Sequence, residues 1–280
     1  MKSPSHGKRL FIGIDRGGTS VRYCLMDSAG RTIKMVKLPS VDIRKFPAQI
    51  KCALDRENVP PSSHAVIATR GAISKHWKIP FLKNALKGRL KNLEVISDLQ
   101  AAYCAALEPG EGFLLLSGTG SAAFALTVEG RPLLSGGLGP ALGDEGSGFW
   151  IGKTWLAAER GISEIPDRNN IRKTAAHARE EIDLAMRKDP VASGVVELAA
   201  LRLSETACRL LPELSSGKTI SVTWGGSVME NAFFRKRVIS ALKLMHPKLN
   251  FKQKRPRRTP AEAAALLALK RFKGDCRADR

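Results

Sequence analysis

The fold is decided by residues 113–150, which read FLLLSGTGSAAFALTVEGRPLLSGGLGPALGDEGSGFW. The stretch opens with an apolar run of strand length and continues into a turn of two glycines and three hydroxyl residues at 117–121. Glycine allows positive φ, and successive backbone N–H groups in such a turn form a concavity suited to a phosphate. A purely structural turn is the alternative, because glycine turns are common in hairpins.

Another stretch with two glycines lies at 143–147 and leads into an amphipathic segment at 148–160. The pattern predicts a helix there, with Asp144 or Ser147 as its N-cap.

A second copy of the first pattern lies near the start of the chain. Residues 10–20, LFIGIDRGGTS, again give an apolar strand, an acceptor side chain and a Gly-Thr turn, with Thr19 and Thr119 in equivalent places. Two strand-like runs follow each turn, at 21–26 and 31–36 in the first copy and at 122–128 and 131–135 in the second. The repeat predicts a duplicated α/β fold that binds a nucleotide between its halves.

The composition is that of a globular enzyme with two domains. The chain has 280 residues, of which 43% are hydrophobic and 26% charged. Its five cysteines show no CxxC or CxH spacing, so we expect no zinc or iron–sulfur site and a cytoplasmic location with reduced thiols. The first apolar run is too short for a signal peptide, and nothing approaches the ~20 apolar residues of a membrane helix.

The formal net charge is +20, with one dense basic run at 252–258. Aromatic residues make up 6% of the chain, and none is interleaved with that run. Nucleic-acid surfaces normally add aromatic stacking residues or a known reading module. We therefore expect a solvated basic surface that attracts anions, with no specific nucleic-acid partner.

The remaining pattern alternates strands and helices. It predicts strands over 64–69, 93–96 and 219–224, a short strand around Phe251, and helices over 44–57, 79–90, 99–107, 171–188, 190–211, 229–245 and 260–272. His64 is expected to be an incidental surface histidine. The domain boundary is expected near 108–111, giving domains 1–109 and 110–280, with the last helix free to pack on the first domain.

Asp98 is the main candidate for chemistry. It follows the predicted strand at 93–96, and ligands bind at the carboxyl ends of strands in α/β sheets. N-capping of the next helix is the alternative. Gly225 and Gly226 follow the strand at 219–224, where they suit either close approach of a nucleotide or a tight turn alone.

Together these pieces resemble the actin-like ATPase and sugar-kinase superfamily, and more narrowly the N-acetylglucosamine kinase and BadF/BadG/BcrA/BcrD-type ATPase family. The resemblance rests on IGIDRGGTSVR (12–22), VISDLQAAYCAAL (95–107), LLLSGTGSAA (114–123), GGLGPALGDEGSGFWIG (136–152), TWGGSVMEN (223–231) and the alanine-rich last helix.

The resemblance implies two ribonuclease-H-like domains with a cleft for ATP and Mg²⁺ between them, and a sugar as the substrate. Asp98 would be the general base. The ATP side would comprise Asp15, Gly17, Gly18, Thr19, Gly118, Thr119, Gly120, Gly225 and Gly226. Asp15 would hold Mg²⁺ through water. The sugar side would comprise Asp42, Asp98, Gly137, Leu138 and Asp144. Arg16 and Arg22 would assist phosphoryl transfer, with a surface role as the alternative for Arg16.

The sequence departs from the family on the sugar side. Leu138 stands where a tryptophan is common, and Asp42 and Ala122 stand where relatives place asparagines. A carboxylate at 42 favours a protonated amine and disfavours a substrate carboxylate. We therefore expect glucosamine to be accepted at least as well as its N-acetyl form, and N-acetylmuramic acid less well. The alternative is that Asp42 points to solvent and has no part in the choice of sugar.

The expected activity is ATP-dependent phosphorylation of a hexose or amino sugar of the N-acetylglucosamine or glucosamine type. Two alternatives remain. One is an ATPase that activates a partner dehydratase or reductase, although no cysteine pattern suits the cluster that such activators bridge. The other is a non-catalytic sugar-sensing or nucleic-acid-binding protein. Assembly as a homodimer is left open.

Overall fold

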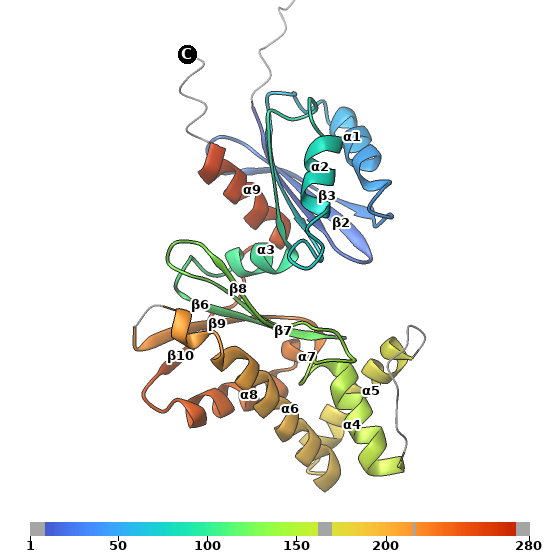
Figure 1. Cartoon of the computed structure of the whole chain (residues 1–280), viewed down its shortest axis with the longest axis vertical. Coiled ribbons are helices and arrows are strands. Elements are labelled where there is room, and N and C mark those ends of the chain that lie inside the picture. The colour runs from blue at the N-terminus through green and yellow to red at the C-terminus, as the bar shows by residue number, and fades with distance from the viewer. Residues whose placement is uncertain (1–8, 162–169, 215–216, 273–280) are drawn as a thin grey trace, which may run out of the picture. The chain divides into compact units, whose positions relative to one another are not determined.

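The chain forms two compact units, each built on one five-stranded sheet (Figure 1). The computed structural model describes residues 9–161, 170–214 and 217–272. The first unit combines residues 1–105 with residues 257–280, and the second spans residues 106–256. The division therefore lies at 105/106, and the last helix, α9 (Pro260–Phe272), belongs to the first unit.

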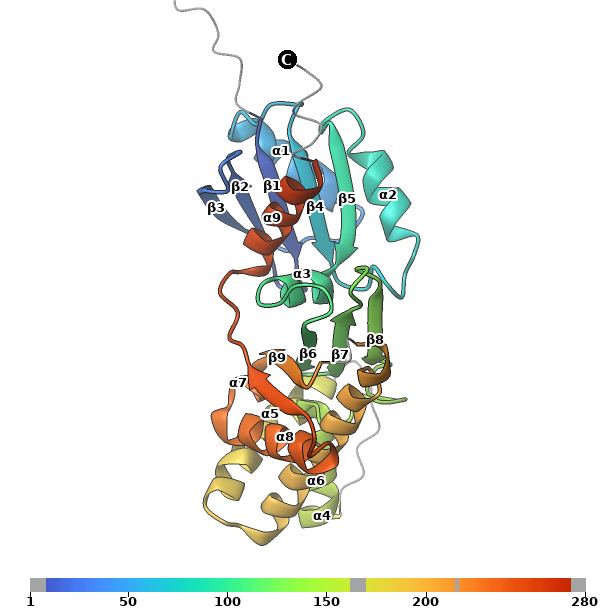
Figure 2. The ribbon, with the colours of Figure 1, turned by 90° about the vertical axis from the view of Figure 1, so that its left-hand side faces the viewer.

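The first sheet has the strand order β3-β2-β1-β4-β5. Its strands are β1 (Phe11–Arg16), β2 (Ser20–Met26), β3 (Thr32–Pro39), β4 (His64–Thr69) and β5 (Asn92–Ser97). The first three strands form an antiparallel meander, while β4 lies parallel to both β1 and β5. The carboxyl ends of β1, β4 and β5 therefore share one edge of the sheet (Figure 2).

The second sheet repeats that order as β10-β9-β6-β7-β8. Its strands are β6 (Gly112–Ser117), β7 (Ser121–Leu126), β8 (Pro132–Gly136), β9 (Thr219–Gly225) and β10 (Asn250–Gln253). The antiparallel meander β6-β7-β8 matches β1-β2-β3, and the parallel strands β9 and β10 match β4 and β5. The duplicated α/β fold predicted from the two glycine turns is confirmed.

Helices cover both faces of the first sheet, because its central strands β1 and β4 are buried on both faces. One face packs on α1 (Phe46–Arg56) and α2 (Lys78–Ala85), and its core includes Ile12, Ile14 and Ile67. The other face packs on α3 (Asp98–Cys104) and α9, and its core includes Phe11, Val66 and Ala68. Successive residues of β1 thus alternate between the two cores, as the pleat requires.

The approach of α9 to β1 is too close for any residue but glycine at position 13. A Cβ built on Gly13 would overlap the carbonyl oxygen of Ala261 and the backbone nitrogen of Ala265. The alanine-rich face of α9 permits this approach, because Ala261, Ala264, Ala265 and Ala268 are all fully buried there. The composition of the last helix is thus explained by its packing against the first sheet.

The second unit carries a larger set of helices: α4 (Gly148–Arg160), α5 (Ile171–Met186), α6 (Pro190–Cys208), α7 (Ser227–Glu230) and α8 (Ala232–Met245). Helices α4, α5, α6 and α8 gather on one side of the sheet (Figure 1). Gly152 of α4 is another forced glycine, because a Cβ there would overlap the carbonyl oxygen of Thr174. None of the described helices is both long and apolar enough to cross a bilayer.

Three expectations drawn from the sequence are corrected. The helix expected over 79–90 ends at Ala85. The helix expected over 229–245 is two helices, because the Asn231 side chain caps α8 by accepting hydrogen bonds from the N–H groups of Phe233 and Phe234. His64 is fully buried, with its ring stacked between Phe11 and Phe272, so it is not a surface histidine.

Candidate active site

The register of the first sheet brings several candidate residues to one edge. Arg16 of β1 pairs with Thr69 of β4, and Thr69 pairs with Ser97 of β5. The next residue along each strand is therefore Gly17, Arg70 and Asp98, respectively. Neighbouring strands lie about 4.8 Å apart, so these three residues leave adjacent strands at the same edge. Ligands of open α/β sheets bind outside this edge.

Asp98 is the first residue of α3, and its carboxylate is half-buried. Ser97 is the N-cap, because its Oγ accepts the N–H of Gln100 at 3.0 Å. Ser97, and not Asp98, therefore takes the N-cap position. Its carboxylate accepts a hydrogen bond from the Leu99 N–H at 3.1 Å. Burial raises the pKa of the Asp98 carboxyl, while this hydrogen bond and the charges of Arg70 and Lys78 oppose the rise.

Asp15 lies at the end of β1 and is buried. Its Oδ2 is 3.6 Å from a guanidinium nitrogen of Arg22, the residue opposite in β2. Burial raises the pKa of the Asp15 carboxyl, the charge of Arg22 lowers it, and the nearby Asp98 carboxylate raises it again. The structure thus places the two acidic candidates of the first unit within electrostatic reach of each other.

The first glycine turn follows Asp15 and exposes Gly18 and Thr19. The Gly17 N–H donates to the Ser20 carbonyl oxygen at 3.0 Å and closes the turn. Thr19 is the last residue of its three-residue turn, whereas Thr119 is the middle residue of the second turn. The two threonines are both exposed, but they do not hold equivalent places as the sequence suggested.

The loop after β3 is tied to the first glycine turn. The Ser40 hydroxyl donates to the Gly17 carbonyl oxygen at 2.9 Å, and the Ser40 N–H donates to the Thr19 carbonyl oxygen at 3.2 Å. Asp42 follows on this loop and is exposed, and its Oδ1 accepts the Arg44 N–H at 2.9 Å. Asp42 is thus close in sequence to a residue that contacts the turn, while one of its carboxylate oxygens stabilises a local turn.

Arg16 contacts the loop after β3 and the start of α1. Its Nη2 donates to the Val41 carbonyl oxygen at 2.7 Å, and its guanidinium carbon is 5.5 Å from the centre of the Phe46 ring. These contacts give Arg16 a structural role between β1 and α1.

In the second unit, two glycine turns converge. Gly226 has a φ of +88°, and a Cβ there would overlap the carbonyl oxygen of Ser117 and lie 2.8 Å from the nitrogen of Gly118. A Cβ on Gly118 would lie 3.6 Å from the Cα of Gly226. The turn at 118–120 and the turn at 225–226 therefore meet backbone to backbone, in a way that side chains would prevent.

The loop 137–144 packs beside the second turn. The Gly137 N–H donates to the Ser121 carbonyl oxygen at 3.0 Å. Asp144 is buried with a φ of +58°, its Oδ1 accepts the Gly139 N–H at 3.2 Å, and its Oδ2 would lie 2.5 Å from a Cβ on Gly120. Left-handed backbone at a non-glycine residue stores strain of the kind found at functional sites. Leu138, by contrast, is 68% exposed.

Ser147 is the N-cap of α4, because its Oγ accepts the Trp150 N–H at 3.2 Å. The choice that the sequence left open between Asp144 and Ser147 is thereby decided. Asp144 does not cap α4. Its carboxylate lies next to Gly120, in the turn at 118–120.

The turns fit a nucleotide polyphosphate. Gly18 and Gly118 carry no side chain, and a Cβ at either position would have no atom closer than 3.6 Å, so a phosphate can approach these turns closely. Within the described residues, no three His, Cys, Asp or Glu side chains come together as a metal cluster. A single carboxylate such as Asp15 suits Mg²⁺ that keeps its water and takes further ligands from phosphates.

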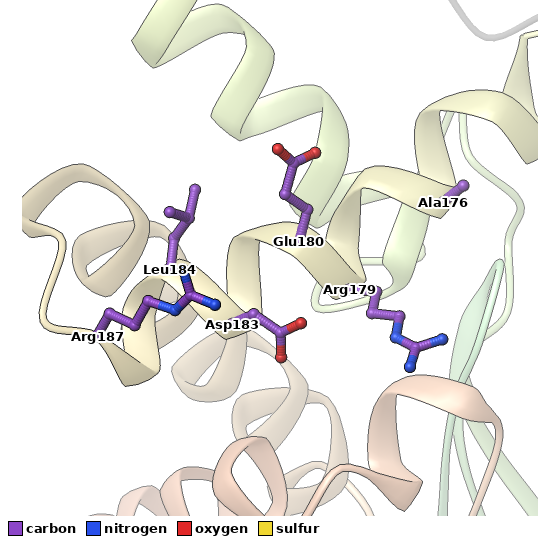
Figure 3. Close-up of a pocket in the computed structure, with 6 residues that line it drawn as sticks. All are labelled: Ala176, Arg179, Glu180, Asp183, Leu184 and Arg187. Atoms are coloured by element: carbon purple, nitrogen blue, oxygen red, sulfur yellow. The ribbon is translucent and has the colours of Figure 1, made fainter.

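An open groove of about 380 Å³ lies elsewhere, along one face of α5 (Figure 3). The described residues that line it are Ala176, Arg179, Glu180, Asp183, Leu184 and Arg187. None of them is a candidate site residue, and their alternating charges are typical of a solvated helix face.

Comparison with known proteins agrees with this geometry. The model of the BadF/BadG/BcrA/BcrD ATPase family matches residues 12–268. The chain belongs to this family. The family assignment made from the six sequence segments is confirmed.

A curated relative, the N-acetylmuramic acid/N-acetylglucosamine kinase of Clostridium acetobutylicum, is 42% identical over 157 residues, which cover 51% of each chain. This chain therefore matches about half the length of that relative. The ROK hexokinase of Thermus thermophilus has a TM-score of 0.66 at 18% identity, covering 95% of this chain and 99% of that one. A ROK glucokinase of Streptomyces griseus, in complex with glucose and AMPPNP, has a TM-score of 0.58 at 17% identity, covering 93% and 99%. Both structures show the same fold.

Two residues of the first unit were missed by reasoning from the sequence. Ser40 bonds to the first glycine turn, and Arg70 lies between that turn and Asp98. The signal for Arg70 was its place directly after the buried strand 64–69, the same kind of place that drew attention to Asp98.

Proposed function

We propose that this protein is an ATP-dependent kinase that phosphorylates a hydroxyl group of a hexose or an amino sugar of the N-acetylglucosamine or glucosamine type. The observation that carries the proposal is the position of Asp98. Asp98 is half-buried and follows β5 at the same edge of the sheet at which the first glycine turn follows β1, and Ser97 holds the N-cap position of α3.

ATP would be held by the glycine turns of both units. Gly17, Gly18 and Thr19 would bind phosphates from the first unit, and Gly118, Thr119 and Gly120 would do so from the second. Gly225 and Gly226 would flank the adenosine, since their backbone meets the second turn. Asp15 would hold Mg²⁺ through water. When bound, ATP with Mg²⁺ supplies the γ-phosphoryl group and neutralises part of its charge.

Asp98 would act as the general base. It would accept the proton of the sugar hydroxyl as the oxygen of that hydroxyl bonds to phosphorus and the bond from phosphorus to the oxygen of ADP breaks. Burial makes the carboxylate more basic by raising its pKa, and the charges of Arg70 and Lys78 favour its ionised form. The net result is a pKa of the Asp98 carboxyl above that of an exposed aspartate.

The sugar would be bound by Asp42, Asp98, Gly137, Leu138 and Asp144. The hydrogen bonds of Ser40 tie the loop of Asp42 to the first turn, and Asp144 packs beside the second. Asp42 would favour the free amine of glucosamine. The name of the Clostridium relative includes a sugar with a carboxylate, so the sugar panel must contain N-acetylmuramic acid.

The test is ATP consumption by the purified chain with glucose, glucosamine, N-acetylglucosamine and N-acetylmuramic acid, with Mg²⁺ present and with it chelated. We expect phosphorylation of at least one sugar, dependence on Mg²⁺, and loss of turnover in Asp98→Asn. Asp42→Asn should shift the ratio of kcat/KM between glucosamine and N-acetylglucosamine toward the N-acetyl form. ATP hydrolysis that no sugar stimulates would contradict the kinase proposal.

A further inference from the structure

Arg70 occupies the centre of the edge at which the candidate residues of the first unit meet. It is the first residue beyond β4, the middle of the three parallel strands. The first residues beyond the two neighbouring strands are Gly17 and Asp98, and these three residues form a row across the edge of the sheet. A side chain at this position lies between the turn assigned to phosphate and the carboxylate assigned to the sugar hydroxyl.

The guanidinium of Arg70 extends toward the first glycine turn. Its Nη1 is 3.9 Å from the position that a Cβ on Gly18 would take. Gly18 and Arg70 are both exposed, so the guanidinium can reach a ligand on this turn. The lack of a side chain at Gly18 leaves the space between the turn and the guanidinium open.

The backbone that carries Arg70 is fixed by a second cation. Lys78, at the start of α2, donates a hydrogen bond from its Nζ to the Arg70 carbonyl oxygen at 2.6 Å. The same Nζ lies 3.2 Å from the Cβ position of Gly71, whose φ is +72°. This hydrogen bond ties the backbone at Arg70 to the start of α2.

We propose that Arg70 is a catalytic residue that binds the non-bridging oxygens of the γ-phosphoryl group while this group passes to the sugar hydroxyl. The inference rests on the proposed kinase function. Charge in a phosphoryl-transfer transition state is spread over the equatorial oxygens, and a guanidinium binds two such oxygens with parallel N–H donors. This role requires a position between the phosphate-binding turn and the general base. Arg70 has Gly17 of the first glycine turn on one side and Asp98, the proposed base, on the other.

The test combines kinetics with nucleotide binding. The variants are Arg70→Gln, which removes the charge, and Arg70→Lys, which keeps the charge but loses the two parallel N–H donors of the guanidinium. Lys75→Gln is the matched control, because it removes an exposed cation from the same segment outside the row. One assay measures kcat with N-acetylglucosamine and N-acetylmuramic acid. The other measures, by calorimetry with Mg²⁺, the dissociation constants of AMPPNP and ADP, which differ by the γ-phosphate.

Arg70→Gln should lower kcat about 10²-fold or more with both sugars. It should also reduce the preference for AMPPNP over ADP by about 10-fold, the effect of losing a hydrogen bond to a charged group. Arg70→Lys should fall between wild type and Arg70→Gln, and Lys75→Gln should match wild type in both assays. Because Arg70 is exposed, thermal unfolding should be unchanged in every variant.

An unchanged kcat together with an unchanged nucleotide preference in Arg70→Gln would overturn the proposal. A loss of activity confined to N-acetylmuramic acid would also overturn it, and would assign Arg70 to the carboxylate of the sugar. If wild type phosphorylates none of the four sugars named under the proposed function, the kinase function fails, and the AMPPNP-to-ADP preference still decides whether Arg70 binds the γ-phosphate.

Discussion

Ser97 and Asp98 are adjacent residues: Ser97 is the N-cap of α3, and Asp98 is the proposed general base. Ser97 caps α3, so the side chain of Asp98 can change without loss of the cap. We predict that Asp98→Asn lowers kcat about 10²- to 10⁴-fold, since the amide cannot take the proton. Nucleotide affinity and the melting temperature should stay at wild-type values. Ser97→Ala should instead destabilise the fold by about 1 kcal/mol, measured by chemical denaturation. Near wild-type turnover in Asp98→Asn would remove its role as the base.

Glu181 of α5 offers a second test on a single residue. Its side chain is fully buried, and neither carboxylate oxygen has a hydrogen-bond partner among the described residues. Burial raises the pKa of Glu181 to about 9 from the ordinary 4.5. The folded state therefore keeps a proton that the unfolded chain loses, and raising the pH from about 5 to 9 favours unfolding by about 1.4 kcal/mol per pH unit.

Glu181→Gln removes this proton release while keeping the size of the side chain. We predict that the stability of the variant relative to wild type rises by about 3 kcal/mol between pH 5.5 and pH 8. Urea denaturation at the two pH values measures the difference. Glu180→Gln controls for the loss of a carboxylate at an exposed neighbour. Equal differences in stability at both pH values would show that Glu181 ionises in the folded protein near its ordinary pKa.

At the scale of elements, the contact between α9 and β1 depends on Gly13. A methyl group there would overlap the backbone at Ala261 and Ala265, which cannot move without displacing the whole helix. We predict that Gly13→Ala destabilises the protein by about 3 kcal/mol or more, measured by denaturation. Gly194→Ala is the matched control: this exposed glycine of α6 has nothing within 4 Å of its Cβ position, so alanine should stabilise by about 0.5–1 kcal/mol. A similar effect of both substitutions would contradict the packing argument.

Elements whose signals are local were predictable from the sequence. The glycine turn at 117–121 and its flanking apolar runs predicted β6 and β7, which the structure contains. The break at Asn231 was missed, although its capping pattern is also local, because the apolar periodicity on both sides suggested one helix. The burial of His64 could not be predicted, since it depends on Phe272 of the last helix, far away in the sequence.

At the scale of the whole molecule, strand pairing decides what the sequence can show of the site. Asp98 was recognised because it ends a strand, and Asp15 because a glycine turn follows it. Arg70 became a candidate site residue only with the register of β1, β4 and β5, which places it between Gly17 and Asp98. Pairing of parallel strands joins segments far apart in the chain, and no local pattern encodes it.

The first unit is built from two segments that are far apart in the sequence. Its sheet comes from residues 9–105, but one face is covered by α9 from the other end of the chain. Without α9, core residues such as Phe11, Met26 and Val66 lose the alanines that bury them. The second unit is one continuous segment, 106–256, with its own sheet and helices.

We predict that residues 106–256 fold alone, with cooperative urea unfolding, and that residues 1–105 do not. The Arg257 N–H donates to the Ala105 carbonyl oxygen at 3.1 Å, so a short Gly-Ser linker can join 1–105 to 257–280 without strain. That joined chain should recover cooperative unfolding, whereas the same chain with Ala265→Asp should not, because a carboxylate would be buried against β1. Cooperative unfolding of 1–105 alone would mean that the first sheet is stable without α9. The position of α9 would then serve something other than the stability of this unit.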